Sequence, residues 1–285
     1  MSAVGLHVLD THMHFWDPDR LSYPWLAGEE TLRRRFAPAD LRPGAHRLAG
    51  AVFVEAGRRD DQAIDEIGWV EELAADWPLL RGIVAHAPLE HGDTVAGHLG
   101  ELSRHPLVRG VRRNVQDEKP GFAVADGYVA GVRQLARYGF TADLCVRHHQ
   151  LPEITELVAR VPEVTFVLDH LGKPGIADGL LDPWRDQISR LAGHPNVVCK
   201  LSGLTTEADP LRWKPDDVLP YLRHALAEFG AQRCLVGGDW PVATLATSYD
   251  RWLDVIAVAL RDRCAAERDA VLRDNAVRIY RLGTV

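Results

Sequence analysis

The feature that most constrains the fold is an alternation of short apolar runs with longer segments of helical periodicity, repeated about eight times. Most of these runs are nearly continuous in apolar residues, which is typical of parallel strands buried on both faces, although Val108–Gln116 is unusually cationic. They are Val8–Trp16, Ala51–Glu55, Gly82–His86, Val108–Gln116, Thr141–Val146, Thr165–His170, Val197–Gly203 and Cys234–Pro241. Repeated strand–helix units predict an α/β fold, a (β/α)8 TIM barrel, in a single domain over residues 1–285.

The segments between these runs carry apolar residues at the spacing of one helix face. In the segment from Asp60 to Trp77, for example, Ile64, Ile67 and Val70 share a face. The predicted helices cover residues 60–77, 93–103, 128–138, 151–161, 215–229, 249–261 and 265–280.

Composition and charge exclude several classes of partner. The net charge of -7 argues against nucleic acid and anionic membranes. No apolar stretch is long enough to span a membrane, and no signal peptide is recognisable. The four cysteines, Cys145, Cys199, Cys234 and Cys264, form no CxxC pair and indicate a reducing compartment. We therefore expect a cytoplasmic protein with a small-molecule partner, and self-association into a homo-oligomer stays open.

The first apolar run contains two histidines, His12 and His14, with one residue between them. Alternate side chains of a strand share a face, so the two imidazoles point the same way. Such a pair can hold a metal ion or a polar substrate atom, or it can simply cap the strand through hydrogen bonds.

Other polar residues stand late in the apolar runs or just after them. They are Glu55, Arg112, Asp143, His170, Lys200 and Asp239. The carboxyl ends of barrel strands form the catalytic face of this architecture. Asp239, which follows two glycines, is placed as a general base, or else as a turn aspartate. His170 can donate to a substrate carbonyl or bind a metal, whereas Asp169 is expected to point to the other face.

Lys200, Arg112, Gln116 and Trp25 are candidates for substrate binding. Lys200 lies in a buried strand and needs a carboxylate or an anion. Glu55 is one partner, unless both residues hydrogen-bond a polyhydroxylated ligand. Arg112 and Gln116 can hold a carboxylate or hydroxyl groups, and we expect Arg112 to face inward.

Two loops complete the set of candidates. The loop from Asp17 to Leu26 is either a lid that brings Trp25 to the substrate or a packed surface loop. His148 and His149 follow the fifth strand and are interpreted as surface loop residues.

Taken together, these motifs resemble the amidohydrolase superfamily, and within it the amidohydrolase 2 branch of fuconolactonase-like and rhamnonolactonase-like proteins. The matching segments are Asp10–Asp17, Tyr23–Leu26, Val54–Ala56, Gly110–Arg113, Gln116–Glu118, Asp169–Pro174, Lys200–Leu204, Gly238–Val242 and Asn275–Tyr280. The resemblance implies an amidohydrolase-like barrel and a cytoplasmic hydrolase that opens a lactone ring, with His12, His14, His170 and Asp239 as the core site.

The resemblance also bears on the metal content. Binuclear members carry a bridging lysine on the fourth strand and a metal-binding histidine on the fifth. This chain has Arg112 on the fourth strand, and Asp143 and Cys145 on the fifth, so a two-metal centre is not expected. One divalent ion such as zinc, held by His12, His14 and Asp239, is compatible with the motif, and so is hydrolysis without a metal.

The resulting hypothesis is hydrolysis of a small sugar lactone, an aldono-1,4- or aldono-1,5-lactone, by water that Asp239 activates. One alternative is a metal-dependent decarboxylase of the same superfamily. Another is a barrel that binds sugar acids without turnover, because a fold alone does not prove a function.

Overall fold

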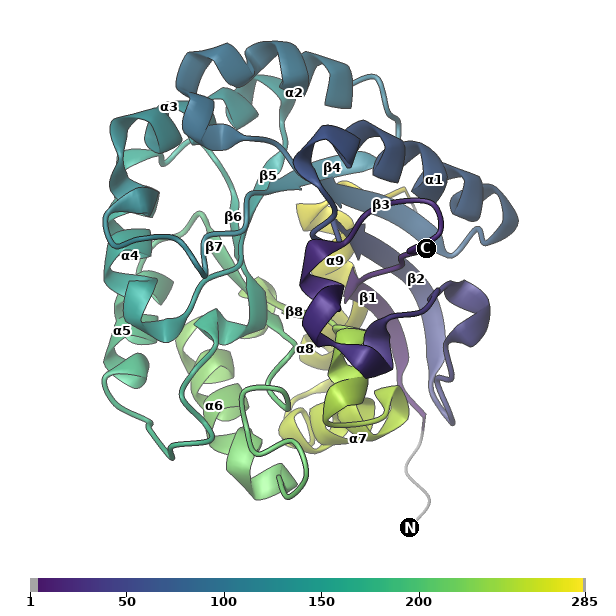
Figure 1. The fold of residues 1–285 in the computed structure, drawn as a ribbon. Helices are drawn as coiled ribbons and strands as arrows, with labels where there is room; N and C mark the ends of the chain where they lie inside the picture. Colours follow the sequence, from purple (N-terminus) through teal and green to yellow (C-terminus); the bar gives the residue numbers. More distant parts are fainter. Residues whose placement is uncertain (1–4, 284–285) are drawn as a thin grey trace.

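The computed structural model describes residues 5–283, so the first four and last two residues of the predicted domain lie outside it. Eight parallel strands pair in chain order and form the ring seen in Figure 1. They are β1 (His7–Met13), β2 (Arg47–Val54), β3 (Leu80–Ala85), β4 (Val108–Arg112), β5 (Thr141–Leu144), β6 (Phe166–Leu168), β7 (Val197–Leu201) and β8 (Cys234–Val236). The predicted (β/α)8 barrel is confirmed.

The ring closes between β1 and β8 through loop contacts rather than a regular ladder. The amide of His14 donates to the carbonyl of Trp240 at 2.8 Å, and the amide of Asp239 donates to the carbonyl of His12 at 2.8 Å. The hydroxyl of Thr11 donates to the carbonyl of Val236 at 2.7 Å. The closure therefore places the two-histidine motif directly beside the loop that carries Asp239.

Helices surround the strands (Figure 1). They are α1 (Ala63–Asp76), α2 (Ala96–Leu102), α3 (Asp126–Tyr138), α4 (Leu151–Arg160), α5 (Trp184–Ala192), α6 (Pro215–Glu228), α7 (Tyr249–Ala259), α8 (Ala265–Asp269) and α9 (Asn275–Ile279). The apolar spacing does not predict α5. The last predicted helix is divided, because a π-helical turn at Ala270–Asp274 separates α8 from α9. No helix among the described residues is long and apolar enough to cross a bilayer.

The barrel interior is filled by inward-facing strand residues, among them Leu9, Val52 and Val167. The C-terminal segment packs against this interior cluster through Tyr280 and Leu282. Burial of this apolar surface stabilises the closed ring, and it fixes the strand ends that carry the polar residues.

Candidate active site

Asp239 lies among three imidazoles at the carboxyl end of the barrel. Its Oδ1 atom is 3.7 Å from Nε2 of His12, 3.5 Å from Nε2 of His14 and 3.9 Å from Nε2 of His170. All four side chains are buried. The structure thus brings the four predicted core residues together around one point.

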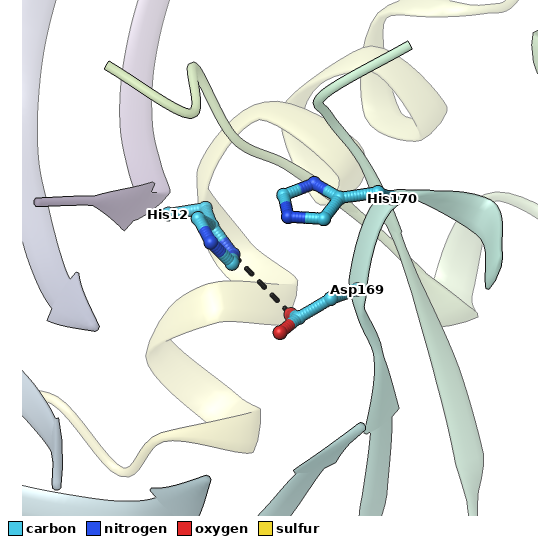
Figure 2. Close-up of side chains that lie close together, drawn as sticks. All are labelled: His12, Asp169 and His170. Atoms are coloured by element: carbon cyan, nitrogen blue, oxygen red, sulfur yellow. Dashed lines mark ion pairs between the residues drawn. The ribbon is translucent and has the colours of Figure 1, made fainter. Parts of the chain in front are cut away.

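Two of these residues have unusual backbone conformations. His170 and Asp239 both have a φ of 52°, in the left-handed region that costs free energy for residues other than glycine. Non-glycine residues held in this region cluster at active sites. The prediction that Asp169 points away from the site is wrong: alternation places Asp169 on the inward face of Val167, and the left-handed backbone of His170 turns that ring to the same side. Asp169 is fully buried and faces His12, as Figure 2 shows.

Each of the three imidazoles has its Nδ1 atom engaged by a neighbour. Nδ1 of His14 is 2.8 Å from the carbonyl of Val54, and Nδ1 of His170 is 2.9 Å from the hydroxyl of Ser202. Nδ1 of His12 is 3.2 Å from Oδ1 of Asp169. These contacts turn all three Nε2 atoms toward Asp239, the arrangement found around histidines that bind metals.

The protonation states of Asp239 and the histidines also suit metal binding. Burial alone would raise the pKa of Asp239, but His170, His14 and His12 outweigh it and hold that pKa below its usual range. Burial lowers the pKa of His170 to about 4, although Asp239 and Asp169 act in the opposite direction. Burial likewise lowers the pKa of His12. At neutral pH the site therefore holds an ionised carboxylate beside the neutral imidazoles of His12 and His170.

A metal ion fits this donor set. Separations of 3.5–3.7 Å from Oδ1 of Asp239 to His12 and His14 are too long for good hydrogen bonds. Two ligands of one tetrahedral zinc lie about 3.3 Å apart, given zinc–ligand bonds of about 2.0–2.1 Å. His12, His14 and Asp239 are recognised as a group that can hold an ion, and so are His12, Asp169 and His170.

Removing one of these donors is expected to weaken zinc binding. We expect His14→Gln to lower the zinc affinity by at least about tenfold, because an amide replaces an imidazole ligand. Competition with a fluorescent zinc chelator measures this directly. The control is His224→Gln on α6, which alters a histidine that contacts the carbonyl of Arg185. Equal zinc affinities of the two variants would show that His14 is not a ligand.

One wall of the site is a network of buried charges. Nε of Arg112 donates to Oε1 of Glu55 at 2.8 Å, and Nη2 donates to the carbonyl of Glu55 at 2.6 Å. Arg58 lies 3.4 Å from Glu55 and 3.7 Å from Glu66. The predicted inward orientation of Arg112 is confirmed. The predicted pairing of Glu55 with Lys200 is wrong, because Glu55 binds the arginines.

Lys200 lies below the site rather than on its surface. Its side chain is fully buried, with Nζ 2.6 Å from Asp143 and 3.0 Å from Asp169. It is 3.3 Å from Nδ1 of His12. The structure therefore places Lys200 behind the histidines, away from the position expected of a group that binds substrate.

A cavity of about 640 Å³ opens above Asp239. Seven predicted site residues line it: His14, Trp25, Glu55, Arg112, Gln116, His170 and Asp239. The indole of Trp25 donates to the carbonyl of Ala56 at 2.7 Å, so the first loop is fastened to the second strand end. His149 is exposed, as predicted, whereas His148 is half-buried with its Nδ1 atom 3.1 Å from the carbonyl of Lys173, and both lie in a short 3-10 helix rather than a loop.

The sequence reasoning missed three residues that shape the site. Arg58 and Lys173 line the cavity. Asp10 accepts hydrogen bonds from the amides of His12 and Gly238 and from the hydroxyl of Tyr249. It thereby joins β1 to the Asp239 loop. The only hint of this role in the sequence is that Asp10 stands two residues before His12. Arg58 and Lys173 stand just after strand ends, where we expected functional groups in general.

Comparison with known proteins agrees with this geometry. The amidohydrolase family model matches residues 9–282. The chain is 37% identical to an L-fucono-1,5-lactonase of Burkholderia multivorans, over 98% of this chain and 97% of the relative. It is 31% identical to an L-fucono-1,5-lactonase of Burkholderia ambifaria, over 96% and 95% of the two chains.

A solved structure gives the same result. The crystal structure of a Burkholderia multivorans amidohydrolase with bound zinc is similar with a TM-score of 0.87 and 35% identity. The match covers 96% of this chain and 99% of that one. With the barrel, the histidine–aspartate centre and the family match in agreement, this chain belongs to the amidohydrolase family.

Proposed function

We propose that the chain hydrolyses a small, uncharged sugar lactone and that Asp239 is the general base. As a member of the amidohydrolase family the chain is a hydrolase. The observation that carries the finer proposal is the ionised carboxylate of Asp239 among three Nε2 atoms at the floor of the cavity. The Burkholderia relatives named L-fucono-1,5-lactonase support the substrate class.

The reaction needs one proton acceptor that later becomes a donor. Asp239 takes a proton from water as the water oxygen bonds to the lactone carbonyl carbon. Nearby groups stabilise the negative charge that develops on the carbonyl oxygen. Asp239 then gives the proton to the ring oxygen as the carbon–oxygen bond breaks. The product is an open-chain hydroxy acid, which releases a proton at neutral pH.

A divalent ion bound by His12, His14 and Asp239 would polarise the carbonyl and lower the pKa of a bound water. Side chains of the protein would bind and orient the substrate. We assign Trp25 to packing against the sugar ring, and Glu55, Arg112 and Gln116 to holding its hydroxyl groups, because all four line the cavity.

Charge pairing in the cavity supports an uncharged substrate. Every arginine and lysine that lines it has a carboxylate within 4 Å among the described residues. The pairs are Arg58–Glu55, Arg59–Asp61, Arg112–Glu55, Arg113–Glu90 and Lys173–Glu207. A substrate carboxylate would have to compete with these partners, whereas hydroxyl groups can share them.

The experiment is a panel of lactones with acid release followed by a pH dye. We expect turnover of neutral aldono-1,5- or aldono-1,4-lactones and little turnover of lactones that carry a ring carboxylate. A second detector records carbon dioxide. Carbon dioxide from a carboxylated substrate would favour the decarboxylase alternative, and tight binding of sugar acids without any turnover would favour a binding protein. Either result would overturn the proposal.

A further inference from the structure

The four consecutive residues from His170 to Lys173, just after β6, form one turn of left-handed helix. Their φ angles are 52°, 54°, 68° and 49°, and the amide of Lys173 donates to the carbonyl of His170 at 2.9 Å. Left-handed backbone costs free energy at every residue except glycine, so such residues usually occur singly and not in runs. Only Gly172 escapes this cost. Strained backbone of this kind persists where the surrounding structure holds it, and it clusters at functional sites.

Rigid neighbours hold this turn in place. The indole of Trp184, at the start of α5, donates to the carbonyl of Leu171 at 2.7 Å. Nδ1 of His148 is 3.1 Å from the carbonyl of Lys173. Trp184 and Leu171 are both buried, so these contacts belong to the packed body of the protein. The direction in which the turn projects its side chains is therefore fixed.

The turn puts the side chain of Lys173 on the same side as that of His170. Residues three apart in a turn closed by such a bond eclipse one another, and both of these side chains line the cavity above Asp239. An extended continuation of β6 would send residues three apart to opposite faces. The strained backbone is thus what brings a lysine to the cavity at this point of the chain.

The ammonium of Lys173 has hydrogen-bonding capacity to spare. It carries three protons, and one is donated to Oε1 of Gln116 at 2.5 Å. Oε1 of Glu207 lies 3.9 Å away, which is too far for a hydrogen bond. Within residues 5–283, Gln116 is the only hydrogen-bond acceptor of this ammonium. A molecule bound in the cavity can therefore accept a hydrogen bond from Lys173 without breaking an existing one.

Lys173 also decides which end of the Gln116 amide faces it. An ammonium can only donate, so it meets the amide oxygen, and the amide nitrogen points to Oδ2 of Asp117 at 3.1 Å. The thiol of Cys145 contacts the same amide oxygen at 3.5 Å. With its oxygen occupied in this way, this wall of the cavity offers N–H donors to a ligand. An oxygen with free lone pairs, such as a sugar hydroxyl, is the group that fits it.

We propose that Lys173 is a substrate-binding residue whose ammonium donates a hydrogen bond to a ring hydroxyl of the lactone, and that the left-handed turn of residues 170–173 holds it in that position. This inference rests on the proposed sugar-lactone substrate. It concerns the binding of the sugar ring and not the hydrolytic step, so it can be tested without turnover.

The experiment measures the binding of an aldono-1,5-lactam, the unreactive amide analogue of a neutral aldonolactone, by isothermal titration calorimetry. Monodeoxy forms of the lactam, each lacking one ring hydroxyl, are measured in parallel. Lys173→Met removes the charge, and Lys173→Gly removes the side chain while suiting the left-handed backbone. The control is Lys119→Met, because Lys119 is exposed and outside the cavity lining. Circular dichroism melting checks that each variant folds.

We expect both Lys173 variants to weaken lactam binding by about 10- to 100-fold, the range for a hydrogen bond to a charged group, and Lys119→Met to bind like the wild type. One monodeoxy lactam should bind the wild type about as weakly as the parent lactam binds Lys173→Met. That lactam should lose nothing further in Lys173→Met, because the contact is already absent. Lys173→Gly should melt at a temperature no lower than Lys173→Met, since glycine relieves the strained backbone.

Lactam affinity within about twofold of the wild type in both Lys173 variants would overturn the proposal, and so would a wild type that does not bind the lactam. A loss in Lys173→Met that is equal for the parent and for every monodeoxy lactam would exclude the hydroxyl contact. A lower melting temperature of Lys173→Gly than of Lys173→Met would exclude strain at this position. Lysine-dependent lactam binding without turnover of any lactone would support this inference and refute the proposed hydrolysis. Lactone turnover with unchanged lactam affinity in both variants would do the reverse.

Discussion

Asp239→Asn is expected to lower kcat for lactone hydrolysis by roughly 1,000-fold, within the range for loss of a general base. An amide cannot take the proton from water, and no other carboxylate oxygen among the described residues lies near Nε2 of all three histidines. The fold should persist, because asparagine has the same shape. Steady-state kinetics measure the loss, and circular dichroism checks the fold.

The control addresses the alternative that Asp239 is a structural turn residue. Asp209→Asn changes an aspartate that is such a turn residue. Oδ1 of Asp209 accepts hydrogen bonds from the backbone amides of Leu211 and Arg212 at 3.0 and 3.1 Å. We expect its kcat to stay within about twofold of wild type, with at most about 1 kcal/mol lost in stability. If Asp239→Asn behaves like Asp209→Asn, the general-base role is wrong.

The convergence of the core residues could be predicted because it depends on topology. Parallel strands of a barrel end at the same rim, so His12, His170 and Asp239 had to approach one another once the alternation of strands and helices was recognised. The apolar strands themselves could be predicted without any knowledge of side-chain contacts. Strand ends were less well predicted, because polar residues such as His170 and Asp239 lie in turns rather than in the ladder.

The partners of the buried charges could not be predicted in this way. Strand order and spacing do not say which side chains meet across the interior of a barrel. Lys200 on β7 pairs with Asp143 on β5 and with Asp169, rather than with Glu55, which directly follows β2. Asp169 was misplaced for a local reason: its face was counted from His170, whose left-handed backbone breaks the alternation, whereas counting from the inward-facing Val167 places Asp169 inward.

Gly203→Ala is expected to lower kcat by about 100-fold or more through displacement of His170. Gly203 follows β7 with a φ of 64°, and an added Cβ would lie 2.3 Å from Nδ1 of His170. The ring must then move, which breaks its 2.9 Å contact with Ser202 and turns Nε2 away from Asp239. The left-handed backbone and the overpacking each add about 1–2 kcal/mol of destabilisation. Kinetics and urea unfolding measure the two effects separately.

A matched glycine separates backbone strain from displacement of the ring. Gly121 also has a positive φ, 89°, but an added Cβ there would meet no atom within 4 Å. Gly121→Ala therefore carries the strain alone, and we expect about 1 kcal/mol of lost stability with an unchanged kcat. If Gly203→Ala also loses stability but keeps its kcat, the position of the His170 ring does not control the reaction. A low kcat in Gly203→Ala alone would assign the loss to His170, because the two variants differ in what the new methyl group touches.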